Sequence, residues 1–212
     1  SIEEVATPEA FSQNPELVHR FYNQRRAHLL EDTINPNDAH FSLAEFESNF
    51  QGEFTIVTQN VDNLHERAGS RNVFHMHGEL FKIRCVRSNR VFIHDQDLDT
   101  DSVCECCNER GTLRPHIVWF GEMPLYMNEI LERIEKCDYF ISIGTSGQVY
   151  PASSFVAQTK KSAKKIEINP DQTQVSWHFD QCINELASVG VKNFFEDLGQ
   201  KLIDSGYYEI KD

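Results

Sequence analysis

Short apolar runs and amphipathic stretches alternate along this chain. Three runs rich in β-branched and aromatic residues predict buried strands, at residues 54–57, 139–143 and 165–168. Helical patterns lie between or after them, at residues 126–137, 151–161 and 193–204. Strands separated by helices imply a parallel sheet with right-handed crossovers, so the pattern predicts an α/β fold.

Helical patterns also fill the N-terminal part of the chain. Residues 8–31 predict a helix with one proline interruption, and Thr7 is its expected N-cap. Residues 42–49 predict another helix, in which Ser42 and Glu45 have the spacing of a capping box. The chain is therefore expected to be largely helical before its first strand.

Residues 83–113 interrupt this alternation of strands and helices. They are polar, lack apolar periodicity and carry most of the six cysteines. We therefore predict two parts, a Rossmann-like domain formed by residues 1–82 and 114–212 and a small zinc-binding module of residues 83–113 inserted in it.

The cysteines of this module have the spacing of zinc ligands. Cys104 and Cys107 form a C-x-x-C pair, and Cys85 lies upstream. A regular partner for Cys85 would stand at position 88, which is Ser88, so the fourth ligand is open. The candidates for that place are Cys106, His94 and water. Buried free thiols are the alternative to a metal site.

Charge and composition exclude several classes of partner. The formal net charge of -13 argues against nonspecific binding of nucleic acid, which needs a basic surface. No apolar run approaches the ~20 residues of a membrane-spanning helix, and the acidic start does not resemble a signal peptide. Clustered cysteines without such a signal fit a reducing compartment, so we expect a cytoplasmic location. We also expect a monomer. Cys137 and Cys182, which lie outside the cluster, are expected to be core residues.

The stretch from Thr58 to Leu80 directly follows the first predicted strand. Open α/β sheets place ligands at the carboxyl ends of their strands. The candidate groups of this stretch are Gln59, Asn60, Asp62, His65, His75 and His77. Because His77 precedes Gly78, its ring could reach a ligand and act as a base near pH 7. His65 and His75 are interpreted as structural.

Two further strand ends carry residues of a ligand-binding type. Gly144, Thr145 and Ser146 follow the second predicted strand, where amides and hydroxyls could bind phosphate or ribose. Asn169 and Pro170 follow the third, where an Asn could contact a ribose hydroxyl. A plain turn is the alternative at both places.

Tyr22 and Arg25 lie three residues apart on a predicted helix, and hence on one face. A phenol beside a guanidinium forms a receptor for a carboxylate. The alternative is a solvated helix face along which the Arg side chain lies.

Taken together, these motifs resemble the sirtuins, the NAD-dependent protein lysine deacylases. The matching segments occur in family order and are residues 58–62, 77–78, 113–122, 144–146 and 168–169. The pair of Tyr22 and Arg25 resembles the class III group, in which these residues bind the acidic end of succinyl-, malonyl- or glutaryl-lysine. The cysteine cluster with Ser88 resembles the bacterial branch of that group.

The resemblance implies an enzyme that consumes NAD as a co-substrate. In sirtuins the amide oxygen of the acyl-lysine attacks the ribose carbon that bears nicotinamide, and the products are free lysine, nicotinamide and O-acyl-ADP-ribose. His77 would be the base that activates a ribose hydroxyl, while Asn60 and Asp62 would hold nicotinamide and ribose. The implied cofactor-binding residues are Gln59, Asn60, Val61, Asp62, Gly144, Thr145, Ser146, Asn169, Pro170, Asp171 and Ala187.

The resemblance also implies how acylated-lysine proteins and peptides bind. Residues 118–122 would form an extended strand that pairs with the substrate backbone. The implied substrate contacts are Tyr22, Arg25, Val118, Phe120, Gly121 and Glu122. The implied activity is desuccinylation and demalonylation, with deacetylation as a second activity.

One part of the family pattern lies outside this sequence. Sirtuins open with a Gly-Ala-Gly-Ile-Ser type loop and an Asp-Phe-Arg type motif, whereas this chain begins at Ser1. The first Gly-rich βα unit is therefore expected to be missing, in a fragment or a shortened form. A non-catalytic, zinc-stabilised module that binds acyl-lysine is the alternative function.

Overall fold

A computed structural model describes residues 2–211, and the chain forms two compact units in it. The first unit consists of residues 1–35, 57–63 and 75–126, and the second of residues 36–56, 64–74 and 127–212. Between residues 2 and 211, no helix is both long and apolar enough to cross a membrane. The boundaries predicted for the inserted module stay a prediction.

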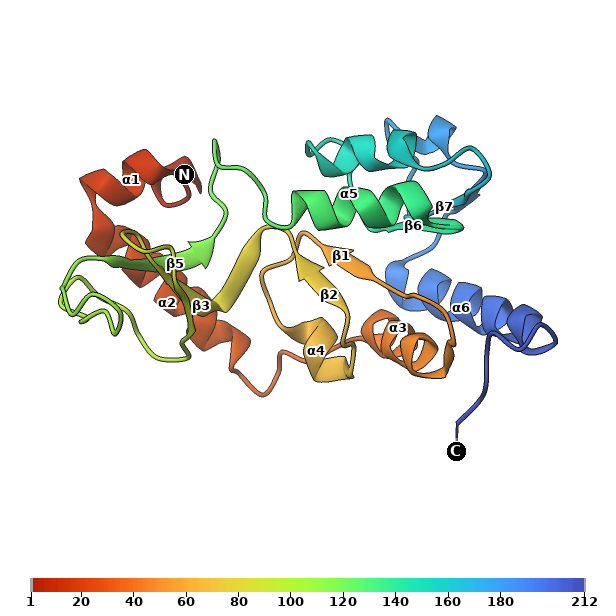
Figure 1. Ribbon diagram of the computed structural model, residues 1–212, viewed down its shortest axis with the longest axis horizontal. Helices are drawn as coiled ribbons and strands as arrows, with labels where there is room; N and C mark the ends of the chain where they lie inside the picture. Colours follow the sequence, from red (N-terminus) through yellow and green to blue (C-terminus); the bar gives the residue numbers. More distant parts are fainter. Residues whose placement is uncertain (1, 212) are drawn as a thin grey trace. The chain divides into compact units, whose positions relative to one another are not determined.

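The first unit begins with helices in place of the single predicted one (Figure 1). They are η1 (Ile2–Glu4, a 3₁₀ helix), α1 (Pro8–Gln13) and α2 (Pro15–Leu29). The hydroxyl of Thr7 accepts a hydrogen bond from the amide of Ala10, which confirms the predicted N-cap. Asn14 caps α2 in the same way, so a new helix begins at the proline.

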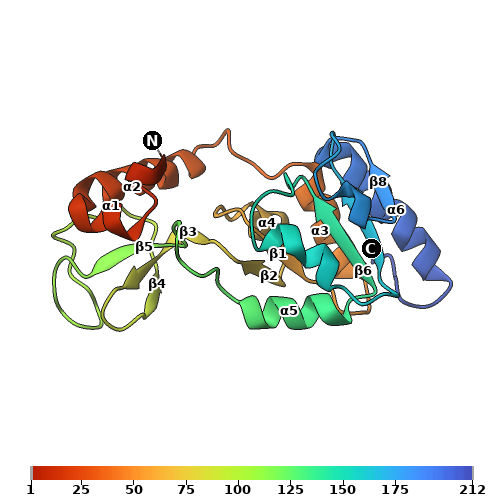
Figure 2. The same cartoon turned by 90° about the horizontal axis from the view of Figure 1, so that it is seen from above.

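An antiparallel sheet completes the first unit. Its strands are β3 (Gly78–Cys85), β4 (Val91–Ile93) and β5 (Leu113–Ile117). β3 pairs with β4 on one side and with β5 on the other, and Figure 2 shows the three strands grouped together. The buried Arg26 of α2 donates to the carbonyl oxygens of Leu80 and Gln96, at 2.9 and 3.1 Å, and so attaches the helix to β3 and to the loop after β4.

The second unit contains the predicted parallel sheet, in the order β6-β7-β8. Its strands are β6 (Tyr139–Ile143), β7 (Lys164–Ile168) and β8 (Gln181–Ile183). The helices of this unit are α3 (Asp38–Asn49), α4 (Leu64–Ala68), α5 (Met127–Lys136) and α6 (Ala187–Ile203). Two 3₁₀ helices are η2 (Ala152–Gln158) and η3 (Ser176–His178). The prediction of an α/β fold with a parallel sheet is confirmed.

The core of the second unit lies where α3 and α6, side by side in Figure 1, meet the sheet. Phe46 of α3 and Phe195 of α6 pack edge to face, with ring centroids 4.8 Å apart. The fully buried Ile168 and Val191 belong to the same cluster. Two short strands, β1 (Ile56–Thr58) and β2 (Val73–His75), pair with each other.

Several predicted details of the second unit are wrong. Helix α3 begins four residues before Ser42, because the side chain of Asn37 accepts from the amides of Ala39 and His40 and forms the capping box with His40. The segment predicted as an α-helix at residues 151–161 contains the 3₁₀ helix η2 instead. Cys182 is exposed on the edge strand β8, so it is not a core residue.

Candidate functional site

The turn after β1 is held in place by hydrogen bonds of the first unit. The hydroxyl of the buried Thr58 accepts from the amide of Asn60 at 3.1 Å. The amide of Leu80 donates to the carbonyl oxygen of Val61 at 2.8 Å. These bonds fix the backbone of residues 59–62 and present the side chain of Asn60 to solvent.

His77 lies at this turn in a state suited to a base. Its Nδ1 is 3.2 Å from the carbonyl oxygen of Gln59. Because a carbonyl oxygen can only accept, the proton resides on Nδ1 and the lone pair on Nε2. Burial lowers the pKa of His77, although the bond to Gln59 acts against it, so the ring is neutral near pH 7.

The neighbouring histidines have the structural roles predicted for them. His75 is buried, and its Nδ1 lies 3.1 Å from the carbonyl oxygen of Asn60. In the second unit, the ring of His65 packs against that of His40, with centroids 4.7 Å apart. Both rings therefore support their local folds.

Gly78 brings the backbone at His77 close to β5. Its φ is +87°, and a Cβ on this residue would lie 2.0 Å from the carbonyl oxygen of His116. The carbonyl oxygen of His77 accepts from the amide of Val118 at 2.9 Å. Only glycine permits this approach, which places the candidate base next to the segment after β5.

Residues 118–122 do not form the predicted strand. β5 ends at Ile117, and the amide of Glu122 donates to the carbonyl oxygen of Trp119 at 3.0 Å, which closes a turn. Gly121 supplies a φ of +85° in this turn. The side chain of Phe120 is exposed. The turn differs from the prediction because the Glu122 carboxylate accepts from the amide of Trp119 at 2.8 Å and so folds the backbone back.

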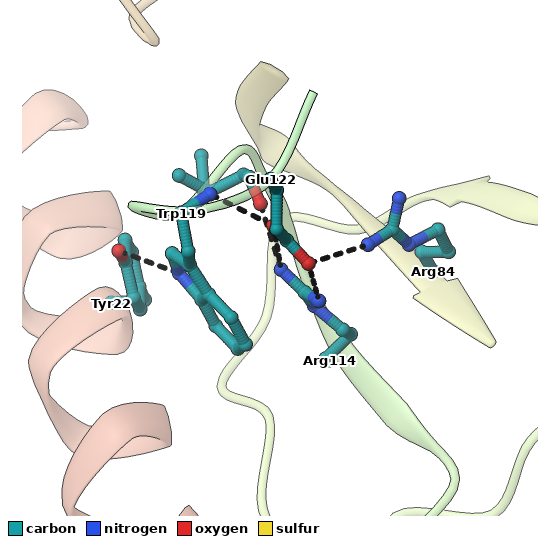
Figure 3. A network of polar contacts seen from close by, with 6 residues as sticks. Tyr22, Arg84, Arg114, Trp119 and Glu122 are labelled. Atoms are coloured by element: carbon teal, nitrogen blue, oxygen red, sulfur yellow. Dashed lines mark hydrogen bonds and ion pairs between the residues drawn. The ribbon is translucent and has the colours of Figure 1, made fainter. Parts of the chain in front are cut away.

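Glu122 is the centre of a polar network (Figure 3). Its carboxylate accepts two hydrogen bonds from the Arg114 guanidinium, at 2.6 and 2.9 Å, and lies 3.7 Å from Arg84. Partial burial acts to raise the pKa of Glu122, but the hydrogen bonds from Arg114 and Trp119 outweigh it and the pKa is lowered. The charged carboxylate therefore anchors the turn.

Tyr22 joins this network from α2. Its hydroxyl accepts a hydrogen bond from the indole nitrogen of Trp119 at 3.0 Å (Figure 3). Burial raises the pKa of Tyr22, so the phenol keeps its proton at neutral pH. Arg25, one turn further along the helix, is exposed, and its guanidinium lies 4.5 Å from the ring centroid of Phe21.

In the second unit, the carboxyl ends of β6 and β7 bring their predicted ligand residues together. The side-chain amide of Asn169 donates to the carbonyl oxygen of Thr145 at 2.6 Å. Gly144 has a φ of +62° and donates its amide hydrogen to the carbonyl oxygen of Ile168. Ser146, Pro170 and Asp171 are exposed beside them. Ala187 is the first residue of α6.

Four cysteines of the first unit form a cluster that fits zinc. The sulfur atoms of Cys85, Cys104, Cys106 and Cys107 all lie within 4.8 Å of one another. Zinc–sulfur bonds of about 2.3 Å in a tetrahedron place sulfur atoms about 3.8 Å apart. Cys85 and Cys104 are fully buried, as in a closed structural site. His94 is not part of the cluster; its Nε2 lies 3.4 Å from the carbonyl oxygen of Asp97.

Comparison with known proteins identifies the family. A sequence profile described as the Sir2 family matches residues 1–151. A relative from Pasteurella multocida, named NAD-dependent protein deacylase, is 55% identical over 182 residues, which are 85% of this chain and 78% of the relative. The chain belongs to the Sir2 family. The predicted resemblance to sirtuins is thus confirmed.

Two further comparisons agree with this sirtuin assignment. A protein of the same name from Vibrio parahaemolyticus is 50% identical over 198 residues, which are 93% of this chain and 82% of the relative. A solved structure described as a complex of a Sir2 homologue with NAD superposes with a TM-score of 0.84 at 35% identity. It covers 95% of this chain and 78% of that one.

Some residues of this sirtuin that shape the site were not predicted. Arg114 and Trp119 hold Glu122 and Tyr22, and both stand inside the family motif without a signal of their own. In the second unit, the buried carboxylate of Glu167 accepts from the hydroxyl groups of Thr173 and Ser176 and so holds the loop after Asn169. An acidic residue inside an apolar strand was the available signal for Glu167.

Proposed function

We propose that this sirtuin removes acidic acyl groups, such as succinyl and malonyl, from lysine side chains of proteins, with deacetylation as a second activity. Its general function is that of an NAD-dependent protein deacylase. Relatives that carry this name match most of the chain at about 50% identity. They do not favour the alternative of a non-catalytic acyl-lysine-binding module.

The chemistry assigned to the first unit depends on His77. NAD, when bound, supplies the ribose carbon that takes the acyl oxygen and the nicotinamide that leaves. The free Nε2 of His77 would take the proton of a ribose hydroxyl, because its Nδ1 is held by the carbonyl oxygen of Gln59. We assign Asn60 and Asp62 to nicotinamide and ribose, and Val61 and Gln59 to the same clamp.

The residues at the strand ends of the second unit are assigned to the adenosine part of NAD. Gly144 leaves open space where a side chain would stand, since no atom lies within 4 Å of its Cβ position. Thr145 and Asn169 are half-buried and joined by a hydrogen bond, and we assign the turns that carry them to ribose and phosphate oxygens. Ser146, Pro170, Asp171 and Ala187 complete this set.

The observation that supports acidic acyl groups is the pair of Tyr22 and Arg25 on one face of α2. Burial raises the pKa of Tyr22, and the hydrogen bond from Trp119 and then the charge of Arg25 act in the opposite direction, so Arg25 lies near enough to act on the phenol electrostatically. A neutral phenol and a guanidinium together offer hydrogen bonds and a charge to a carboxylate, whereas an acetyl group uses neither.

The zinc-type cluster is assigned a structural role. Its cysteines are not joined in disulfides, which suits the cytoplasm that we propose as the location.

Substitution of Arg25 tests the acyl preference. Arg25→Met keeps the length of the side chain and removes the charge, so kcat/KM for a succinyl-lysine peptide should fall at least tenfold more than that for the acetyl-lysine peptide of the same sequence. Arg20→Met changes another exposed arginine of α2 and is the matched control. Equal losses on both peptides would refute the preference for acidic acyl groups.

A further inference from the structure

The hydroxyl of Tyr22 accepts a hydrogen bond, and its own proton is left to donate. One of its lone pairs accepts from the indole nitrogen of Trp119 at 3.0 Å. Within residues 2–211 the structure shows no acceptor for the proton of this hydroxyl. Tyr22 is 4% exposed, and a buried donor without an acceptor is costly. The proton of Tyr22 is therefore available for an acceptor on a ligand.

Trp119 is fixed tightly enough to direct that proton. The guanidinium carbon of Arg114 lies 3.4 Å from the centroid of its ring, and the Glu122 carboxylate accepts from its backbone amide. The same carboxylate receives two hydrogen bonds from Arg114. Figure 3 shows this continuous path from Glu122 through Trp119 to Tyr22. Trp119 is 2% exposed, so its indole cannot turn away into solvent.

We propose that Trp119 is a specificity-determining positioning residue, whose indole N–H turns the Tyr22 hydroxyl so that its proton points to the carboxylate of an acidic acyl group. This inference rests on the proposed preference for acidic acyl groups. A hydroxyl has only one proton, and once a donor occupies one lone pair, the proton must point elsewhere. A hydroxyl that already accepts a bond is also a stronger donor, because hydrogen bonds in series polarise one another.

Arg25 and Trp119 act on the same ligand group in different ways. Arg25 supplies a charge, which attracts any acid at the receptor. Trp119 supplies no charge. Its ring packs against Arg114 and Phe11, and its indole N–H donates to Tyr22, so its hydrogen bond acts on the ligand carboxylate through the phenol. An acetyl group has no carboxylate, and its binding should be far less sensitive to where the proton of Tyr22 points.

The test is a double-mutant cycle on peptide binding. The dissociation constants of fluorescent succinyl-lysine and acetyl-lysine peptides of one sequence are measured by anisotropy, with the full chain. Trp119→Phe keeps an aromatic ring above Arg114 and removes the N–H donor. It should weaken succinyl-peptide binding relative to acetyl-peptide binding by about threefold to tenfold, the usual effect of one hydrogen bond. Trp177→Phe, at the exposed second tryptophan, is the control and should change neither constant.

The second half of the cycle separates positioning from packing. In a Tyr22→Phe background, Trp119→Phe should cause no further change in the succinyl-to-acetyl ratio, because the hydroxyl it directs is gone. An equal loss for both peptides, or an undiminished effect in the Tyr22→Phe background, would overturn the role of Trp119. Replacing Trp119 by 3-benzothienyl-alanine, which has the shape of tryptophan without the N–H, gives the same comparison if Trp119→Phe does not fold.

Arg25→Met distinguishes this inference from the function on which it rests. If Arg25→Met leaves the succinyl-to-acetyl ratio of the dissociation constants unchanged, the acidic-acyl receptor itself is refuted. If Arg25→Met removes the preference for the succinyl-lysine peptide while Trp119→Phe leaves that preference unchanged, the receptor stands and only the role of Trp119 is refuted.

Discussion

The hydroxyl oxygen of Ser88 lies 3.1 Å from the sulfur of Cys106. Residue 88 is the place where a regular C-x-x-C partner of Cys85 would stand, and Ser88 cannot supply a thiolate. Cys106 belongs to the four-sulfur cluster and lies 3.2 Å from the sulfur of Cys104. The thiol missing at position 88 is thus replaced by one from the opposite turn.

Removal of Cys106 should therefore weaken zinc binding. Structural zinc in small domains is bound by about 10–16 kcal/mol, so one of four ligands contributes roughly 3 kcal/mol, or about a hundredfold in affinity. Cys106→Ser should show this loss in competition with a chromophoric chelator, whereas Cys182→Ser, outside the cluster, should bind zinc normally. Adding Ser88→Cys to Cys106→Ser should restore affinity. Unchanged affinity in Cys106→Ser would show that another ligand completes the site.

The role of Cys106 could not be predicted from spacing. Cys104 and Cys107 have a regular C-x-x-C separation, but the direction of a side chain between them depends on how the turn closes. Here the amide of Asn108 donates to the carbonyl oxygen of Cys104, and Asn108 adopts a φ of +59°. This tight turn directs the Cys106 sulfur toward Ser88, a contact that exists only after β3 has folded alongside.

The strands of the first unit could also not be predicted from the hydrophobic pattern of the sequence. The parallel strands of the second unit are short apolar runs, which hydrophobicity alone reveals. β5 is buried along its whole length yet contains Arg114 and His116, whose polarity argues against a buried strand. Arg114 is tolerated because Glu122 pairs with it, and that partner lies beyond the strand. In β3 a register shift between Gly78 and Ile83 breaks the alternation that would indicate a strand.

Gly78 should be irreplaceable even by alanine. A Cβ would overlap the backbone oxygen of His116 at 2.0 Å, and the φ of +87° disfavours any L-residue. Gly78→Ala should therefore destabilise the protein by at least about 3 kcal/mol in urea denaturation. Gly111→Ala, in the same unit, is the control. Gly111 has a φ of +67°, but a Cβ added there would lie 4.0 Å from its nearest neighbour, the carbonyl oxygen of Thr100. It should cost only about 1–2 kcal/mol, and equal costs would contradict the importance of the close approach.

The pH dependence of turnover should report the neutral form of His77. A base must be deprotonated, so kcat/KM should fall as the pH falls through the pKa of His77 in the free enzyme. Because burial lowers that pKa below the ordinary 6.5, the midpoint of the acidic limb should lie below pH 6.5. His65→Gln should leave this midpoint in place. A midpoint above 6.5, or O-acyl-ADP-ribose formation at a normal rate by His77→Tyr, would exclude His77 as the base.

His116 should make the protein less stable in acid. Burial, aided by the nearby charge of Arg84, lowers its pKa to about 4, while Glu79 acts in the opposite direction. In the unfolded chain its pKa is about 6.5, so the unfolded state takes up a proton first as the pH falls. The stability that the neutral ring contributes is thus complete above pH 6.5 and is lost progressively toward pH 4. Between pH 7 and 5 the loss should be about 2 kcal/mol.

His116→Gln removes the titrating ring and keeps a neutral polar side chain. The free energy of unfolding from urea titrations should therefore fall less steeply between pH 7 and 5 in this variant than in the parent, by about 2 kcal/mol over the interval. His28→Gln, at an exposed histidine of α2, should retain the slope of the parent. Zinc content must be equal in all samples, since the cysteine cluster also takes up protons in acid. Parallel curves for the parent and His116→Gln would show that the pKa of His116 is the same in the folded and unfolded states and that burial does not lower it.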